Sequence, residues 1–175
     1  MSSHVLSKKN TTALRIATAF GMSPRLRLDL SVNILTNLAV RNNIITVFGG
    51  DQERPFLHVK DASNSIMNFL NYKITNSQDI YNVGCDELNG TINDIAKLIE
   101  KNVPGSSISL SSENVDARNY AVSFKKYKDL FPNEKFTTVL DSINQFIKIF
   151  EQKEIKFRDS VYSNLLTTKT FINDN

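Results

Sequence analysis

Short apolar runs alternate along this chain with stretches whose apolar residues recur every three or four positions. The run Thr12–Phe20 is apolar and partly β-branched, and a Gly-Met-Ser-Pro turn follows it, so it predicts a buried strand. Pro55 lies near the start of another such run, a position that suits the edge or entry of a strand. The further predicted strands are Asn43–Gly50, Arg54–Val59, Asp79–Gly84 and, more weakly, Ser106–Ser112.

Helices are predicted between these strands. The first follows Asp29 and carries an apolar stripe; the second spans Lys60–Tyr72 and is expected to be capped near Asp61. Thr91 is the predicted N-cap of a third helix, with Asp94 in its first turn, where an acid suits the helix dipole. The inward residues of the second helix are predicted to be Ala62, Ile66, Phe69 and Leu70. The last three predicted helices are Ile92–Asn102, Phe124–Phe131 and Thr138–Gln152.

This alternation of strands and helices predicts a mixed α/β or α+β fold. With 175 residues, the chain is long enough for one domain with a real core. Residues 13–152 form the expected body. Residues 1–12 are expected to be a disordered or partial lead-in, and residues 153–175 a tail that runs over the surface.

Composition excludes several classes of function. The net charge of +3 is small and no basic run dominates, so neither a nucleic acid nor a membrane surface is an expected partner. A single cysteine, Cys85, excludes an intramolecular disulfide and a multi-cysteine metal site, and the two histidines lie far apart. No metal site is expected. The sequence shows no apolar run of membrane-spanning length and no signal-peptide pattern, and a cytoplasmic protein is the expectation.

No complete catalytic motif or cofactor cradle is present in the sequence. None of the six glycines forms GxGxxG, GxxGxxG or a P-loop, and no serine lies in GxSxG. We interpret Cys85 as a small buried residue and His58, which alternates with Leu57 and Val59, as structural. We therefore assign no catalytic residue.

Four segments in order nevertheless resemble one family. They are "LRIATAFGMSPRLRLDLSVN", "ITVFGGDQERPFLHVKDAS", "DIYNVG" and "DARNYAVSFKKYKDL". Together they resemble the C-terminal part of the extended short-chain dehydrogenases/reductases, which are NAD-dependent nucleotide-sugar epimerases and dehydratases. The resemblance implies an incomplete Rossmann-type portion joined to a small α+β substrate-binding domain. It covers Ala13 to about Phe150.

Two motifs of that family are missing here. The family carries GxxGxxG near its start and a catalytic Tyr-x-x-x-Lys before the "LR" strand. Only "HVLSK", His4–Lys8, mimics the second motif, and it lies too close to Leu14 to match. The resemblance therefore implies a substrate-binding half whose NAD(P) loop lies elsewhere. We expect either a truncated product or one piece of a split enzyme, with a separate Rossmann-half chain or another copy of itself as partner.

Two arginines are the leading candidates for binding a nucleotide-sugar. The resemblance implies that Arg54 reaches the diphosphate, which its guanidinium can bind through two parallel hydrogen bonds. The alternative is that Arg54 pairs with Asp51 or Glu53. Arg118 matches a second diphosphate position, and its alternative is a pairing with Asp116.

The resemblance assigns further positions around the two arginines. Asn33 matches a residue that bonds the sugar-phosphate, although a surface asparagine on a helix is common. Thr18 departs from the asparagine of many epimerases, and the backbone of Thr46–Phe48, with Val47 at its centre, matches the segment that packs the base. Arg25 and Arg27 either line the sugar pocket or face solvent. Ile16 and Ala17 either approach the nicotinamide ring of NAD(P) or are core residues.

Two functions therefore remain open on the sequence. One is the substrate-binding part of an NAD-dependent nucleotide-sugar enzyme, inactive by itself. The other is a non-catalytic binding or interaction module, or a remnant. Free edges of the first and fourth strands would favour a partner or aggregation.

Overall fold

The structure is a computed structural model that describes residues 11–72, 79–113, 116–152 and 162–164. Most of the predicted lead-in and tail lies outside these residues. Where the tail is described, it lies against the loop before the first helix: Leu28 N donates to Tyr162 O at 2.8 Å, and Asn164 N donates to Asp29 Oδ2 at 3.2 Å.

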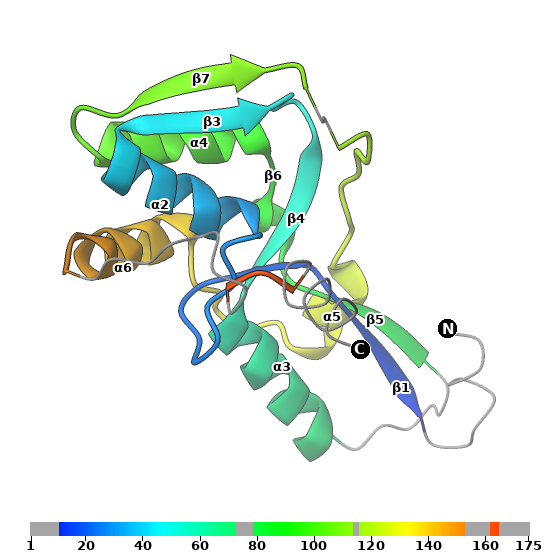
Figure 1. Cartoon of the computed structure of the whole chain (residues 1–175). Coiled ribbons are helices and arrows are strands. Elements are labelled where there is room, and N and C mark those ends of the chain that lie inside the picture. Colours follow the sequence, from blue (N-terminus) through cyan, green and yellow to red (C-terminus); the bar gives the residue numbers. More distant parts are fainter. Residues whose placement is uncertain (1–10, 73–78, 114–115, 153–161, 165–175) are drawn as a thin grey trace, which may run out of the picture.

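The predicted alternation of strands and helices is confirmed, and the fold is mixed α/β (Figure 1). The strands are β1 (Thr12–Ile16), β2 (Thr18–Phe20), β3 (Ile44–Phe48), β4 (Glu53–His58), β5 (Asp79–Val83), β6 (Asn89–Thr91) and β7 (Ser107–Ser111). The helices are α2 (Ser31–Asn42), α3 (Val59–Asn71), η1 (Asp86–Leu88), α4 (Ile92–Asn102), α5 (Lys125–Leu130) and α6 (Val139–Gln152).

Among the described residues the strands form three small sheets. β1 pairs with β5 in parallel, and β3 pairs with β7 in parallel. The central sheet has the order β2-β4-β6, with β2 parallel and β6 antiparallel to β4. Figure 1 shows β3 and β7 at one end of the molecule and β1 and β5 at the other, with β4 running between them.

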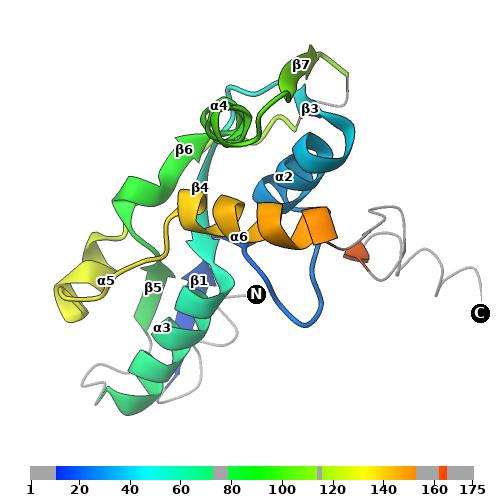
Figure 2. The same ribbon diagram turned by 90° about the vertical axis from the view of Figure 1, so that its left-hand side faces the viewer.

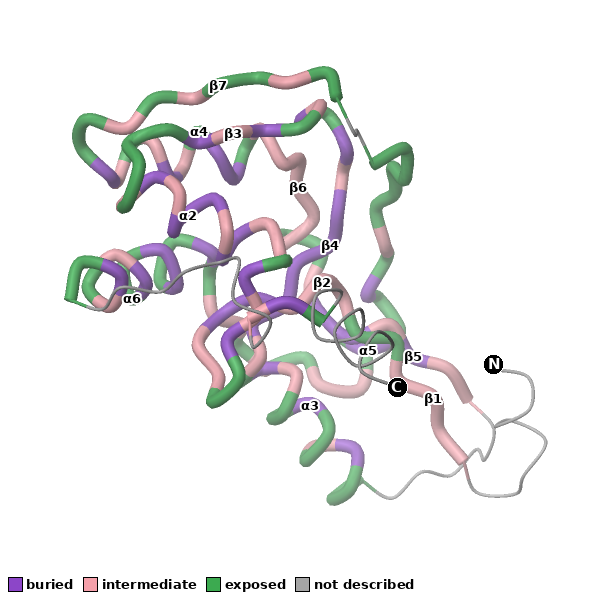
Figure 3. Tube along the Cα trace, viewed as in Figure 1, coloured by how far each residue is buried: buried purple, intermediate pink, exposed green. Residues whose placement is uncertain are grey.

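β4 separates two hydrophobic clusters because successive side chains of a strand point to opposite faces. Phe56 belongs to the larger cluster, which is built mainly by α2, α4 and α6, and Leu57 belongs to the smaller one, with Phe69, Tyr81 and Tyr127. Figure 2 shows α2, α4 and α6 above α3 in this view. Figure 3 shows β4 buried along most of its length, although its sequence, ERPFLH, includes the polar residues Glu53, Arg54 and His58.

The predicted strand Thr12–Phe20 is wrong in two respects. It breaks at Ala17 into β1 and β2, because Ile16 pairs with Val83 whereas Thr18 pairs with Phe56 of a different strand. It is also not buried throughout: β1 is half-buried to exposed, and Ile16 is 41% exposed. One sequence run therefore serves two sheets.

The predicted helix starts also need correction. α2 begins after Leu30, and Asp29 makes no cap; instead Asp29 accepts two hydrogen bonds from Arg27. α3 is capped by His58, whose Nδ1 accepts from Lys60 N at 3.1 Å, while the Asp61 carboxylate accepts from Thr137 N at 2.6 Å. The predicted cap of α4 is confirmed: Thr91 and Asp94 form a reciprocal capping box.

The buried face of α3 differs from the predicted one. Phe69 is buried, as predicted, but Asp61 and Ser65 are the other buried residues of this helix. Ile66 and Leu70 are 46% and 72% exposed. The helix buries polar residues because Asp61 and Ser65 each find a partner inside, in Thr137 and Tyr127.

Candidate functional site

A cleft of about 400 Å³, whose lining includes Arg54, Asp116 and Arg118, lies at one side of β4. The turn before β4 fixes its shape: Gly49 and Gly50 have positive φ, and a Cβ on Gly50 would lie 2.1 Å from the Asn93 side chain. Gln52 closes this turn by accepting from Gly50 N and donating to Phe48 O. Six residues that line the cleft are Thr18, Val47, Phe48, Arg54, Arg118 and Tyr120.

Arg54 is the buried cation of this cleft, with only 7% of the residue exposed. Its Nη1 donates to the carbonyl of Glu53 at 2.8 Å, and its guanidinium lies 5.2 Å from the ring centroid of Tyr120. Its Nη2 lies 3.1 Å from Asp116 Oδ2. A buried guanidinium needs an anion, and Asp116 provides one.

Arg118 binds the same carboxylate. Its Nη2 lies 2.6 Å from Asp116 Oδ2, and its Nε lies 3.0 and 3.1 Å from the two carboxylate oxygens. These hydrogen bonds from Arg118, together with the one from Arg54, hold the pKa of Asp116 well below its usual range. Asp116 also raises the pKa of Arg118. Two arginines from distant segments thus converge on one anion.

The expected alternatives for the arginines are partly wrong. Arg54 pairs neither with Asp51 nor with Glu53 through their side chains; Asp51 instead accepts from Asn93 Nδ2 at 2.9 Å. The pairing of Arg118 with Asp116 is confirmed. The bridging of both arginines by Asp116 was not predictable, since no sequence pattern indicates contacts between segments so far apart.

Asn33 lies beside the cleft with its amide engaged by the backbone. Its Oδ1 accepts from Gly21 N at 3.2 Å, its Nδ2 donates to Arg27 O at 2.8 Å, and the residue is 1% exposed. The alternative interpretation of Asn33 as a surface asparagine is wrong. Asn33 ties the loop of residues 21–27 to α2, and its role toward a sugar-phosphate stays a prediction.

A second hollow, of about 530 Å³, adjoins the cleft and shares Thr18 and Tyr120 with it. Ile16 and Ala17, which the resemblance places near the nicotinamide, line this hollow together with Asn82. The expectation that Ile16 is a core residue is wrong, because it lies exposed at the end of β1.

Arg25 and Arg27 are not among the residues that line either space. Arg27 is held by Asp29 at 2.9 Å. Their role in a sugar pocket stays a prediction.

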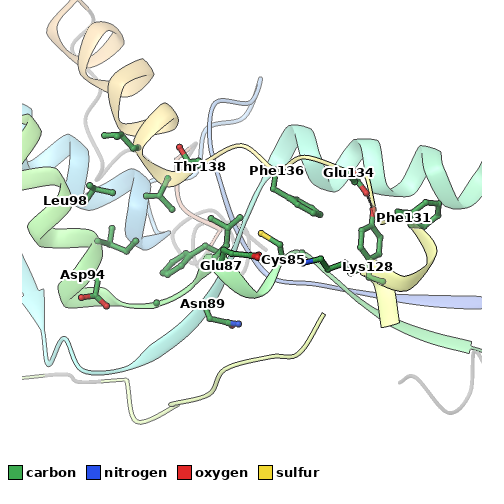
Figure 4. Close-up of a pocket in the computed structure, with 18 of the residues that line it drawn as sticks. Cys85, Glu87, Asn89, Asp94, Leu98, Lys128, Phe131, Glu134, Phe136 and Thr138 are labelled. Atoms are coloured by element: carbon green, nitrogen blue, oxygen red, sulfur yellow. Dashed lines mark hydrogen bonds and ion pairs between the residues drawn. The ribbon is translucent and has the colours of Figure 1, made fainter. Parts of the chain in front are cut away.

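A further cavity, of about 670 Å³, has neither Arg54 nor Arg118 in its lining (Figure 4). Figure 4 shows Asp94 and Leu98 at one end, Phe131 and Glu134 at the other, and Cys85, Glu87 and Lys128 between them. The polar groups pair with one another: Lys128 Nζ lies 3.8 Å from Glu87 Oε1, and Tyr127 donates to Glu134. The cavity thus presents no arrangement of chemical groups comparable to the arginine cleft.

Cys85 and His58 lack the features of reactive groups. Burial and the Glu87 carboxylate raise the pKa of the Cys85 thiol to about 11, which disfavours the nucleophilic thiolate. Cys85 is half-buried and not fully buried as predicted. His58 caps α3, and its ring packs edge-on against Phe20 with 5.4 Å between the ring centroids. Both contacts indicate a structural role.

The described residues contain no group of three or more His, Cys, Asp or Glu residues that could hold a metal ion. No helix among them is both long and apolar enough to cross a bilayer.

Comparison with known proteins shows the fold but not a family. No protein-family model matches the sequence. Similar solved structures include dTDP-glucose 4,6-dehydratase from Bacillus anthracis in complex with NAD (19% identity, TM-score 0.66, 89% of this chain and 47% of that chain). UDP-glucuronic acid 4-epimerase from Bacillus cereus, in complex with UDP-glucuronic acid and NAD, is similar at 22% identity (TM-score 0.64, 79% and 44% of the two chains). ADP-L-glycero-D-manno-heptose-6-epimerase from Helicobacter pylori is similar at 16% identity (TM-score 0.69, 87% and 49%).

The fold therefore resembles that of NAD-dependent nucleotide-sugar dehydratases and epimerases. The chain spans about half the length of these neighbours. At identities this low, the likeness concerns the fold alone, and it transfers neither a substrate nor an activity.

Proposed function

We propose that residues 13–152 are the substrate-binding part of an NAD-dependent nucleotide-sugar epimerase or dehydratase, and that Arg54 and Arg118 bind the diphosphate. The convergence of the two guanidinium groups on one anion at the cleft carries this proposal. Guanidinium groups bind carboxylate and phosphate oxygens with the same geometry. A cleft that already holds one anion between two arginines is therefore suited to a diphosphate.

The rest of the ligand fits the space around the arginines. Val47 and Phe48 line the cleft beside Arg54, and Phe48 is 47% exposed, so its ring is available to a nucleotide base. Thr18 lies where the cleft meets the adjoining hollow and would face the sugar. Asn33 would act by holding the loop that borders the site.

The proposal includes NAD as the cofactor, but this chain would bind only part of it. The hollow lined by Ile16, Ala17 and Asn82 would receive the ring end of the cofactor. The glycines of this sequence form no pyrophosphate cradle, so a further polypeptide segment must hold the rest. When bound, NAD would supply the hydride acceptor and donor for the sugar, and the residues of this chain would orient the sugar for that exchange.

The partner in this proposal is the dinucleotide-binding half, as a segment of a longer polypeptide or as a separate chain. Among described strands, β1 pairs only with β5 and leaves its other edge open. Ile66, Met67 and Leu70 of α3 are exposed, and Phe69 of the same helix packs on Tyr81 of β5. Parallel sheets are normally covered on both faces, which supports docking at this end. A reading frame adjacent to the gene that encodes GxxGxxG and Tyr-x-x-x-Lys would support this partner.

The second candidate is a non-catalytic interaction module, and the exposed apolar residues of α3 favour it equally. Nucleotide binding that depends on Arg54 would distinguish the two candidate functions, because an interaction module has no need of a diphosphate site. We place the protein in the cytoplasm on either candidate, and its use of a single cysteine supports this.

Calorimetric titration tests the proposal. Purified chain is titrated with UDP-glucuronic acid, dTDP-glucose, UDP, ADP and NAD. We expect saturable binding of at least one nucleotide diphosphate, roughly tenfold or more weaker in Arg54→Ala and in Arg118→Ala, since each removes a charge-assisted contact. Arg118 is 74% exposed, so Arg118→Ala tests the site even if the buried Arg54 proves necessary for folding.

Arg41→Ala is the matched control. Arg41 lies in the last turn of α2, outside the residues that line the cleft, and its loss removes the same charge. A folded chain that binds none of the nucleotides, or an Arg41→Ala variant as weak as the other two, would refute the diphosphate site.

A further inference from the structure

A carboxylate of the chain itself occupies the place between the two arginines. Oδ2 of Asp116 lies 3.1 Å from Arg54 Nη2 and 2.6 Å from Arg118 Nη2, so one oxygen bridges both guanidinium groups. The oxygen of a bound phosphate would take this position. We propose that Asp116 is a tethered competitor of the diphosphate, which sets the affinity and selectivity of the cleft by having to be displaced. This inference rests on the proposed function.

The contacts of Asp116 differ in strength. The Asp116 and Arg118 side chains are 43% and 74% exposed, and exposed ion pairs are weak in water. The Arg54 side chain is only 9% exposed, and a buried guanidinium left without an anion is costly. Arg54 therefore permits an exchange of one anion for another but disfavours an empty site.

The backbone near Asp116 limits what has to move. Tyr120 N donates to Glu53 O at 3.2 Å, and Asn119 Oδ1 accepts from Glu53 N at 2.9 Å. Val122 is held by Asn89 through two hydrogen bonds, at 3.0 and 3.1 Å. The segment 119–122 thus stays fixed to β4 and β6. Displacement requires that the Asp116 side chain turn out to solvent and that its Oδ1 give up the hydrogen bond from Arg118 N, which is 3.1 Å long.

The exchange has a consequence for selectivity. A ligand binds in place of the Asp116 carboxylate only if its contacts with the two guanidinium groups are stronger than those that the carboxylate made. A diphosphate carries oxygens on two phosphorus atoms, which can reach the two guanidinium groups separately, whereas a carboxylate has only two oxygens in one plane. Asp116 thereby excludes simple carboxylates and favours diphosphates.

The test removes the competitor and keeps its shape. Asp116→Asn is titrated by calorimetry with UDP, ADP and inorganic pyrophosphate beside the wild-type chain. We expect binding roughly three- to tenfold tighter, since the lost competitor is a surface-exposed bidentate pair. In the double variant with Arg54→Ala the gain should disappear.

Asp51→Asn is the control for general charge. Asp51 lies in the turn before β4, contacts Asn93 and does not line the cleft. We expect Asp51→Asn to change the affinity for the nucleotide diphosphates by less than about twofold, because salt screens exposed charges that lie outside the binding site. An equal gain in Asp51→Asn, or unchanged or weaker binding in Asp116→Asn, would overturn the role of Asp116 while leaving the Arg54-dependent site intact. Absence of binding in both wild type and Asp116→Asn would refute the proposed function as well.

Discussion

Two asparagines on one helix provide the sharpest test of how the border of the cleft is built. Asn33 and Asn37 both lie on α2 and are 1% and 3% exposed. Both amide atoms of Asn33 are bonded to the backbone of the preceding loop, whereas Oδ1 of Asn37 is buried without a hydrogen-bond partner. We therefore expect Asn33→Leu and Asn37→Leu to have opposite effects on stability.

The size of the difference follows from the bonds that are lost. Asn33→Leu leaves the buried Gly21 N–H and the partly buried Arg27 carbonyl without their partners. Each such group costs about 1–3 kcal/mol when fully buried. Because the Arg27 carbonyl is only partly buried and can bond water, we expect a loss in the lower part of the summed range, about 2–4 kcal/mol in the free energy of unfolding. In a domain of this size this lowers Tm by about 4–16 °C. Asn37→Leu removes an unsatisfied carbonyl, so we expect a change between zero and a gain of about 1 kcal/mol.

Urea denaturation followed by far-ultraviolet circular dichroism measures both values. The pair is matched, because each variant makes the same substitution in the same helix and any gain in helix propensity cancels. Asn33→Leu within about 0.5 kcal/mol of wild type would refute the structural role of Asn33. If nucleotide binding then weakened without loss of stability, Asn33 would be a ligand contact.

Two further predictions concern titratable groups. Burial holds the pKa of His58 below its ordinary value of 6.5, with Asp61 and Asp141 opposing this and Lys60 adding to it, so the folded chain favours the neutral imidazole. The contribution of His58 to stability is therefore present above pH 6.5 and is lost as the pH falls. Urea denaturation between pH 7.5 and 5 should show a smaller decline in the free energy of unfolding for His58→Asn than for wild type. Equal declines in the two proteins would contradict the lowered pKa of His58. With a pKa of about 11, Cys85 should react with iodoacetamide at pH 8 at least roughly tenfold more slowly than in the urea-unfolded chain, and equal rates would contradict its burial.

Local sequence determined most of the secondary structure. The helical stripes and the apolar runs of β3, β4 and β5 lie where the pattern predicts them, because periodicity reports directly on which side of an element is buried. The capping box of Thr91 and Asp94 was also predictable, since both partners lie within one turn. Arg54 was identifiable as a candidate only through the family resemblance of its segment, because its residue type and position alone fit an ordinary ion pair equally well.

The tertiary structure decided the features that depend on distant segments. Sequence could not show that Thr12–Phe20 divides between two sheets, because β5 and β4 supply the partners. It could not show that α3 leaves Ile66 and Leu70 exposed, since the burial of Ser65 depends on Tyr127. Above all, it could not show that Asp116 joins Arg54 to Arg118. A buried charge is satisfied by whichever opposite charge the folded chain brings close, and only the three-dimensional arrangement determines which one that is.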